Sequence, residues 1–233
     1  MAYPSGRGSP SPIPRLHLLT DMEQSRIDLM VRRGEVNTQI AECKECGLHN
    51  HGKGPVPFRG PTPCRIMVLG EAPGITDDRR GKPFLGETGR LLDSMCCEAG
   101  LGSTEQMFLA NSICCLPVNG VPGEVLSACL PNLRSQVQLA DPAWVLTLGS
   151  TALTAVQVDA QVTKVHGRPF GLQYGPFINR WIFPTFHPNA VIRDPKLKAK
   201  VMADLTTFRD CLEGTMDIKQ IALVVGRRGK VKV

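Results

Sequence analysis

One stretch of the chain, residues 68–86, combines acidic, aromatic and turn-forming residues in a way that is typical of a ligand-binding loop. It follows the apolar run at residues 66–69, so we expect it to leave the carboxyl end of a buried strand, where open α/β sheets bind their ligands. It carries two acids six positions apart, Glu71 and Asp77, and one aromatic ring, Phe84. The glycines and prolines between them favour turns. The stretch therefore predicts a loop that surrounds something small and planar.

Two further polar residues, Asn111 and His187, each follow an apolar run that predicts a strand. Since the carboxyl ends of parallel strands meet at one edge of a sheet, we expect Glu71, Asn111 and His187 to converge on one crevice. The Asn111 amide has a donor and an acceptor, so it can read the amide edge of a pyrimidine while Phe84 stacks on its face. Taken singly, the same residue types also suit ordinary roles as a capping amide, a core aromatic, a turn acid or a surface histidine.

The chain has nine cysteines, an odd number that fits poorly with a closed set of disulfides. Cys43 and Cys46 form a Cys-x-x-Cys pair, and Cys115 and Cys129 lie further along the chain. Four thiolates from separate segments can hold an iron–sulfur cluster or a tetrahedral zinc ion, and spacing alone does not choose the metal. A redox pair or a set of buried thiols is the alternative that these residues leave open.

The elements that must position these residues follow the order of an α/β protein. Apolar runs predict four strands, at residues 65–69, 108–110, 144–149 and 181–184. Strands that alternate with helices predict a three-layer α/β/α fold with a central, mostly parallel four-stranded sheet. The helices are expected at residues 21–42 with a break at Gly34, 89–99, 122–139 with an interruption near Pro131, 150–156 and 196–212.

Composition narrows the class of protein. A chain of 233 residues, 42% of them hydrophobic, is sufficient for one large domain, and a formal net charge of +6 suits a polyanionic partner without requiring one. No run approaches the roughly 18 apolar residues of a membrane span, so we expect an intracellular protein without membrane association. We predict a disordered, Pro-, Gly- and Ser-rich tail at residues 1–20, a folded domain at residues 21–217 and a basic C-terminal extension at residues 218–233.

Taken together, the polar blocks resemble the signature of a known family. Blocks in the same order and with compatible spacing are found in the family-4 uracil-DNA glycosylases, the iron–sulfur branch of the uracil-DNA glycosylase superfamily. The resemblance implies a single α/β/α domain, a [4Fe–4S] cluster, and hydrolysis of the N-glycosidic bond of flipped deoxyuridine in DNA, which leaves an abasic site for base-excision repair. The likeness lies between residues 43 and 212, in residues 70–74, residues 81–86, Asn111 with Cys115, and residues 185–188.

The resemblance also implies roles for single residues that bind the cluster and the base. The cluster ligands would be four cysteines, Cys43, Cys46, Cys115 and Cys129. Phe84 would stack on the flipped uracil, Asn111 would hydrogen-bond to its edge, and His187 would lie against its O2. The turn of the first block would complete the pocket with Gly70, Ala72, Pro73 and Gly74.

The same likeness implies how the bond is cleaved and how DNA is held. Either Glu71 or Asp77 would position the attacking water. In the loop after the His-Pro pair, Val191 or Ile192 would fill the gap left by the base, and Arg193 would hold a phosphate. The implied partner is uracil-containing DNA, single- or double-stranded, and we expect a monomer in the cytoplasm or associated with the nucleoid.

One departure from the family pattern motivates a second hypothesis. The family has a basic residue on each side of the third cysteine, whereas Cys114 and Leu116 flank Cys115 here, and the interval to Cys129 is slightly short. Cys114 is therefore an alternative to Cys115 as a ligand. The second hypothesis is a non-catalytic iron–sulfur nucleic-acid-binding protein that retains the pocket, and a third is a zinc protein without a role on DNA.

Overall fold

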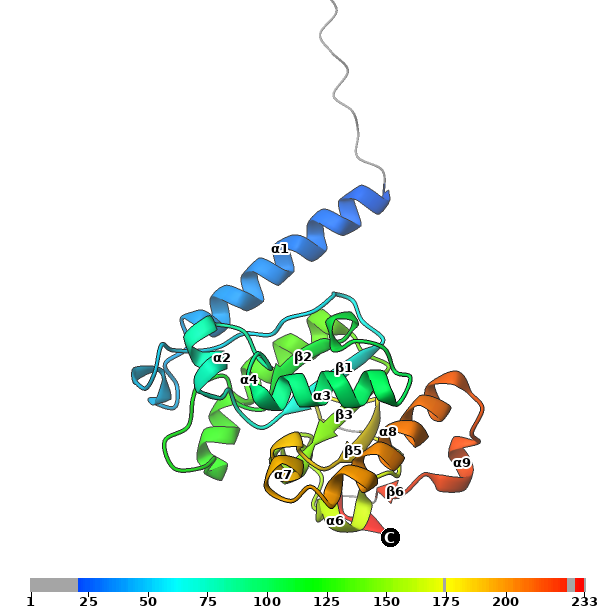
Figure 1. The fold of residues 1–233 in the computed structure, drawn as a ribbon. Helices are drawn as coiled ribbons and strands as arrows, with labels where there is room; N and C mark the ends of the chain where they lie inside the picture. The colour runs from blue at the N-terminus through cyan, green and yellow to red at the C-terminus, as the bar shows by residue number, and fades with distance from the viewer. Residues whose placement is uncertain (1–20, 174, 226–228, 233) are drawn as a thin grey trace, which may run out of the picture.

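The computed structural model describes residues 21–173, 175–225 and 229–232, and it confirms the α/β/α layers with a mostly parallel sheet (Figure 1). The central sheet has five strands in the order β2-β1-β3-β5-β4. Four of them run parallel, and β4 pairs antiparallel with β5. The strands are β1 (Ile66–Gly70), β2 (Phe108–Asn111), β3 (Trp144–Leu148), β4 (Phe170–Gly171) and β5 (Trp181–Thr185), with a separate hairpin of β6 (Val224–Val225) and β7 (Val231–Lys232).

The prediction of four strands missed β4, because a strand of two residues is too short to show an alternating pattern. The larger helices lie close to where they were expected, but two predicted interruptions are wrong. The helices are α1 (Asp21–Ala41), α2 (Ile75–Arg80), α3 (Glu87–Glu98), α4 (Gly123–Ala140), α5 (Gly149–Ala155), α6 (Val162–Val165), α7 (Pro188–Arg193), α8 (Leu197–Glu213) and α9 (Ile218–Ile221), with 3-10 turns at Leu48–Asn50 and Thr104–Gln106.

The two uninterrupted helices, α1 and α4, pack against each other. Helix α1 continues through Gly34, whose cost in a helix is only about 1 kcal/mol relative to alanine. Helix α4 continues through Pro131, since the buried Leu133 and Val137 on the following turn fix it to the sheet. Packing outweighs the local preference of a single residue in both cases.

Alternating strand residues divide the core between the two faces of the sheet. Met67 and Leu69 of β1 pack with Leu133 and Val137 of α4 in one buried cluster. Val68 of β1 packs in the other cluster, with side chains of α3 and α8. Figure 1 shows α3 and α8 in front of the sheet and α4 behind it. Helices on both faces leave the carboxyl edge of the parallel strands as the place where polar residues gather.

The register of the strands fixes what lies along that edge. Gly70 at the end of β1 pairs with Asn111 at the end of β2, and Leu148 of β3 pairs with Thr185 of β5. The segments that follow these strands therefore begin side by side, although the sequence separates them widely. No helix of the described residues is long and apolar enough to cross a membrane. The predicted tail at residues 1–20 lies outside the described residues.

Candidate active site

Three of the predicted base-binding residues, Gly70, Phe84 and Asn111, meet at the end of β1. A Cβ atom built on Gly70 would lie 2.5 Å from Oδ1 of Asn111 and 2.6 Å from Cζ of Phe84. Real Cβ contacts are essentially never this short, so only glycine leaves space for the amide and the ring together. Both side chains are buried, each with 6% of its surface exposed. The structure thus places an amide and a flat aromatic surface beside each other at the strand edge.

The backbone of Phe84 is in the left-handed region, with φ at 59°. For a residue with a side chain, this conformation costs on the order of 1–2 kcal/mol relative to the right-handed one. A strained residue of this kind persists only where its surroundings hold it, and such residues cluster at functional sites. The orientation of the Phe84 ring is therefore a constrained property of the fold.

Asp77 lies in α2, a helix where the sequence pattern predicts a loop. Its Oδ2 accepts a hydrogen bond from the Gly74 amide at 3.2 Å, and its Oδ1 accepts from the amides of Leu85 at 2.7 Å and Gly86 at 3.3 Å. The carboxylate is 6% exposed. Asp77 therefore ties the start of the loop, at the turn formed by Ala72 and Pro73, to its end beyond Phe84.

Glu71 has a different environment from Asp77. It is half-buried directly after β1, and its Oε2 accepts a hydrogen bond of 2.6 Å from Oγ1 of Thr151 in α5. Thr151 was missed in the sequence because its nearness to Glu71 depends on β3 lying next to β1. Among the described residues, this is the one hydrogen bond to the Glu71 side chain, so the carboxylate retains capacity to accept others.

His187 begins α7 and is held in one tautomer. Its Nδ1 accepts a hydrogen bond of 3.1 Å from the Asn189 amide, and because an amide N–H only donates, the ring proton of the neutral histidine is on Nε2. Burial lowers the pKa of His187 and nearby Arg193 lowers it further, while the Glu71 carboxylate opposes both effects. The site therefore holds a neutral imidazole whose Nε2–H is a hydrogen-bond donor.

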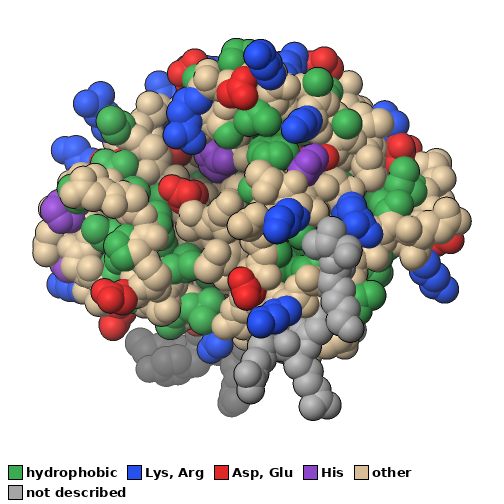
Figure 2. All heavy atoms as spheres, turned by 90° about the horizontal axis from the view of Figure 1, so that it is seen from below, with side chains coloured by type: hydrophobic (Ala, Val, Ile, Leu, Met, Phe, Trp, Pro, Cys, Tyr) green, Lys and Arg blue, Asp and Glu red, His purple; other side chains and the backbone are tan. Residues whose placement is uncertain are grey.

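The predicted DNA-contacting residues of α7 do not share one environment. Val191 is 5% exposed and packs in the core cluster with α3 and α8, so its side chain is not available to fill a gap in DNA. Ile192 and Arg193 are exposed. Seen from below, the molecule shows basic and acidic side chains interspersed around histidines and hydrophobic side chains (Figure 2).

No sequence pattern indicates the role of Asp204, a buried residue that supports the segment before His187. Asp204 of α8 accepts a hydrogen bond of 2.6 Å from Oγ1 of Thr185 and lies 2.9 Å from Nδ1 of His166. The His166 ring packs against Phe186, with 4.5 Å between the ring centroids. These contacts anchor the two residues before His187. Only the folded chain brings residues 166 and 204 together, so no local pattern could indicate them.

The cysteines of the predicted ligand set lie near one another. Burial raises the pKa of the Cys115 thiol to about 12, and the neighbouring thiols of Cys129, Cys46 and Cys43 raise it too. A hydrogen bond from Cys114 lowers the pKa of Cys129 to about 7, and a hydrogen bond with Cys46 also lowers it. Thiols from three separate segments of the chain thus face a common space.

Four thiolates can hold either one metal ion or an iron–sulfur cluster, and the two groups need different spacings of their ligands. Within the described residues, no group of three or more His, Cys, Asp or Glu side chains is placed to hold one metal ion. A [4Fe–4S] cluster binds each thiolate at a different iron atom, so its ligands stand further apart than those of one ion. Cys115 interacts with all three other predicted ligands, whereas Cys114 interacts with Cys129 and Cys43 and also receives a contact of 3.9 Å from Nε2 of Gln136. Both thiols are buried. Thiols from three segments are a donor set of the kind that such a cluster takes.

Comparison with known proteins identifies the family of the chain. The family model described as the uracil DNA glycosylase superfamily matches residues 57–206. A type-4 uracil-DNA glycosylase of Sulfurisphaera tokodaii is 30% identical over 76% of this chain and 83% of its own length. Type-4 uracil-DNA glycosylases of Pyrobaculum aerophilum and Thermotoga maritima are each 32% identical, over 72% and 73% of this chain and 89% of their own lengths. The chain therefore belongs to the uracil-DNA glycosylase superfamily.

Proposed function

We propose that this protein is a uracil-DNA glycosylase of the type-4 group, which hydrolyses the N-glycosidic bond of deoxyuridine in DNA. The observation that carries the proposal is the packing of Asn111 and Phe84 against Gly70, which joins an edge-reading amide to a stacking surface. The names of the relatives support the same substrate. Flipping the nucleotide costs a few kcal/mol, and stacking on Phe84 with hydrogen bonds to Asn111 offsets that cost.

The remaining side chains suit the charges that develop as the bond breaks. By analogy with glycoside hydrolysis, the sugar becomes oxocarbenium-like while the departing uracil becomes an anion. Nε2–H of His187 would donate to uracil O2 and stabilise that anion. Glu71 would hold the attacking water and stabilise the cationic sugar. Thr151 keeps the Glu71 carboxylate in place through its hydrogen bond.

We assign Asp77 to the support of the pocket rather than to the water. Its two oxygens accept three main-chain hydrogen bonds, and its side chain is buried. The pocket turn of Gly70, Ala72, Pro73 and Gly74 and the ring of Phe84 then depend on Asp77 for their spacing. Ile192 and Arg193 are the exposed candidates for contact with DNA.

We further propose that Cys43, Cys46, Cys115 and Cys129 hold a [4Fe–4S] cluster. When bound, the cluster would supply a rigid covalent link between the chain after α1, the segment after β2 and helix α4. The proposed catalytic domain covers residues 21–217 and acts as a monomer on single- or double-stranded DNA in the cytoplasm or nucleoid.

The direct test uses the purified protein with its metal, incubated with a single strand that contains one uracil and then treated with alkali. Scission at the uracil, and none in a strand with thymine at that position, is the expected result. Asn111→Ala and His187→Ala should each slow scission strongly, while visible absorbance shows that the cluster is retained. Binding without scission by the cluster-loaded wild-type protein would instead support a non-catalytic binding protein.

A further inference from the structure

Arg59 lies in a segment that runs along β2 at the edge of the sheet. Its amide donates to the Leu109 carbonyl at 3.0 Å, and the Leu109 amide donates to the Arg59 carbonyl at 2.8 Å. The ring of the preceding residue, Phe58, stacks on Phe108 with 4.7 Å between centroids. These contacts hold the backbone of Arg59 firmly against the sheet, so its side chain starts from a rigid base.

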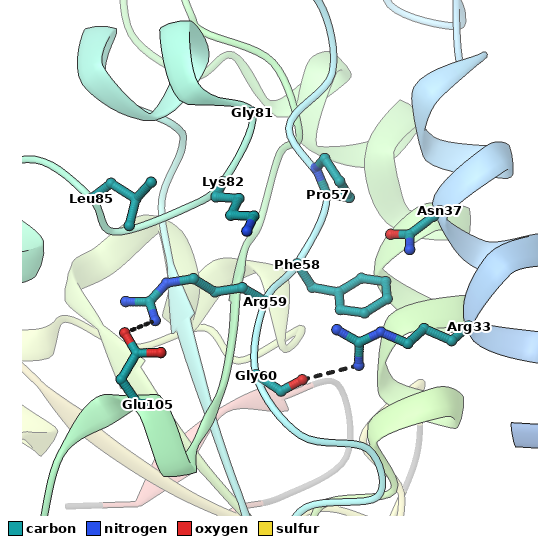
Figure 3. A pocket seen from close by; sticks show the side chains of 10 residues that line it. All are labelled: Arg33, Asn37, Pro57, Phe58, Arg59, Gly60, Gly81, Lys82, Leu85 and Glu105. Atoms are coloured by element: carbon teal, nitrogen blue, oxygen red, sulfur yellow. Dashed lines mark hydrogen bonds and ion pairs between the residues drawn. The ribbon is translucent and has the colours of Figure 1, made fainter. Parts of the chain in front are cut away.

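The Arg59 side chain reaches from this base to the segment that carries Phe84 (Figure 3). Its Nε donates to the Pro83 carbonyl at 2.8 Å, and its Nη2 lies 3.5 Å from the Phe84 carbonyl. Its Nη1 lies 2.6 Å from Oε1 of Glu105. The Arg59 side chain is 12% exposed. A planar guanidinium presents donors in several fixed directions, so one residue can hold both carbonyls and the carboxylate at once.

The carbonyl of Phe84 is confined from the other side by α3. A Cβ atom on Gly89 would lie 2.0 Å from the Phe84 oxygen, so the helix approaches this carbonyl as closely as a glycine permits. The Asp77 carboxylate accepts hydrogen bonds from the amides of Leu85 and Gly86, the two residues after Phe84. The left-handed Phe84 is thus held by the Arg59 cation, which contacts the carbonyls of Pro83 and Phe84, and by the Asp77 anion, which accepts the amides of the two residues after it.

We propose that Arg59, oriented by Glu105, is a positioning residue that sets the orientation of the Phe84 ring for the flipped base. The proposal rests on the proposed function, because it concerns the ring that would stack on uracil. The three guanidinium nitrogens of Arg59 engage carbonyls and a carboxylate, so Arg59 acts through Phe84 rather than on the base.

Arg33 provides a matched control, because it lines the same cavity of about 550 Å³. Its Nη1 donates to the Gly60 carbonyl at 3.0 Å and to Oγ1 of Thr62 at 3.2 Å, and its guanidinium lies 4.9 Å from the centroid of Phe58. Figure 3 shows Arg33 extending from α1 toward Gly60 and Phe58, with Lys82 and Leu85 on the opposite side of the cavity. Replacing Arg33 removes a cation from the cavity and leaves the contacts of Arg59 in place.

The experiment is a double-mutant cycle on the cluster-loaded protein, measured as the single-turnover rate of uracil excision with enzyme in excess. Arg59→Ala should slow excision about 10- to 100-fold, since misplacing a positioned group by about 1 Å can cost that much. In a Phe84→Leu background, where the flat ring is already absent, Arg59→Ala should cost less than about 3-fold, as coupled residues are non-additive. Glu105→Gln should slow excision less than Arg59→Ala, and its effect should likewise shrink in the Phe84→Leu background. Glu105→Gln replaces Arg59→Ala in the cycle if Arg59→Ala does not fold.

Two further readouts separate positioning from general loss of structure. Affinity for DNA that already contains an abasic site should stay close to the wild-type value in Arg59→Ala, because no base then stacks on Phe84. Arg33→Ala should leave the excision rate close to that of the wild type.

Equal slowing by Arg59→Ala with and without Phe84, or a matching loss of affinity for abasic DNA, would overturn the positioning role alone. An inactive wild-type protein would instead overturn the proposed function and this inference with it.

Discussion

Replacing Gly70 with alanine tests the geometry of the pocket with a single methyl group. The added Cβ would lie 2.5 Å from Oδ1 of Asn111 and 2.6 Å from Cζ of Phe84. Since non-bonded heavy atoms settle at about 3.5–4.0 Å, the amide and the ring must each move by about 1 Å to admit it. Both side chains are buried at the strand edge, so their surroundings resist this movement.

The expected result is a large loss of activity with a moderate loss of stability. A displacement of about 1 Å in a positioned group lowers the rate of the chemical step by about 100-fold. Overpacking of a buried position lowers the free energy of unfolding by about 1–3 kcal/mol, which leaves a protein of ordinary stability folded. We therefore expect the single-turnover rate of uracil excision to fall about 100-fold at a temperature where circular dichroism shows a folded protein.

Gly86→Ala is the matched control for this change. It adds the same methyl group to the same loop, where the nearest atom is Cβ of Thr76 at 3.6 Å, an ordinary contact. Its backbone φ of −81° also accepts alanine. A Gly70→Ala protein that excises uracil at the rate of Gly86→Ala would show that Asn111 and Phe84 do not jointly contact the base.

Three other predictions concern the residues around this pocket. Asp77→Asn should lower the free energy of unfolding in urea by about 1–3 kcal/mol, because it replaces one oxygen of a buried carboxylate that accepts three main-chain hydrogen bonds. Glu71→Gln should instead lower the excision rate about 100-fold or more with little loss of stability. The reverse pattern would exchange the roles of the two residues. Because burial lowers the pKa of His187 from its usual 6.5, the excision rate should be flat above pH 7. The rate should fall at lower pH, where a proton on Nδ1 breaks the hydrogen bond from the Asn189 amide that orients the ring. The unfolded state binds this proton near pH 6.5 and the folded state only at lower pH, so stability also declines as pH falls below 6.5, and His187→Gln should remove this decline from urea titrations. Thr151→Val should slow excision about 10-fold by removing a hydrogen bond to a carboxylate, and a Thr151→Ser protein as slow as the valine variant would argue against that bond.

The features that the sequence could predict are those with a local pattern. The strands that end in Gly70, Asn111 and Thr185 are four or five residues long, and their mostly apolar sequences predict them. Because parallel strands end at the same edge of a sheet, the residues that follow them can then be predicted to lie close together. The sequence predicts loops where the structure has helices α2 and α7, because six residues are too few to show helical periodicity. Both depend on caps and tertiary contacts instead, as the bonds of Asp77 and His187 to main-chain amides show.

The features that the sequence could not predict depend on pairings between distant segments. Thr151 reaches Glu71 only because β3 lies next to β1 in the sheet. Arg59 reaches the Phe84 segment because residue 59 pairs with Leu109 at the sheet edge, a register that no composition signal reveals. The burial of Val191 is a third example, since the rotation of α7 against α3 and α8 decides which of its residues faces outward.

Two carboxylates of the loop, Glu71 and Asp77, lie in different environments in the fold. A carboxylate has about four sites for accepting hydrogen bonds. Asp77 is buried and uses three of these sites on main-chain amides, which leaves little room to hold a water. Glu71 is half-buried and, among the described residues, accepts one hydrogen bond, from a hydroxyl that fixes one oxygen and leaves the other free to bind. The spacing of the two acids in the sequence does not distinguish them, whereas the number of donors around each one supports our proposal that Asp77 holds the pocket together and Glu71 holds the water.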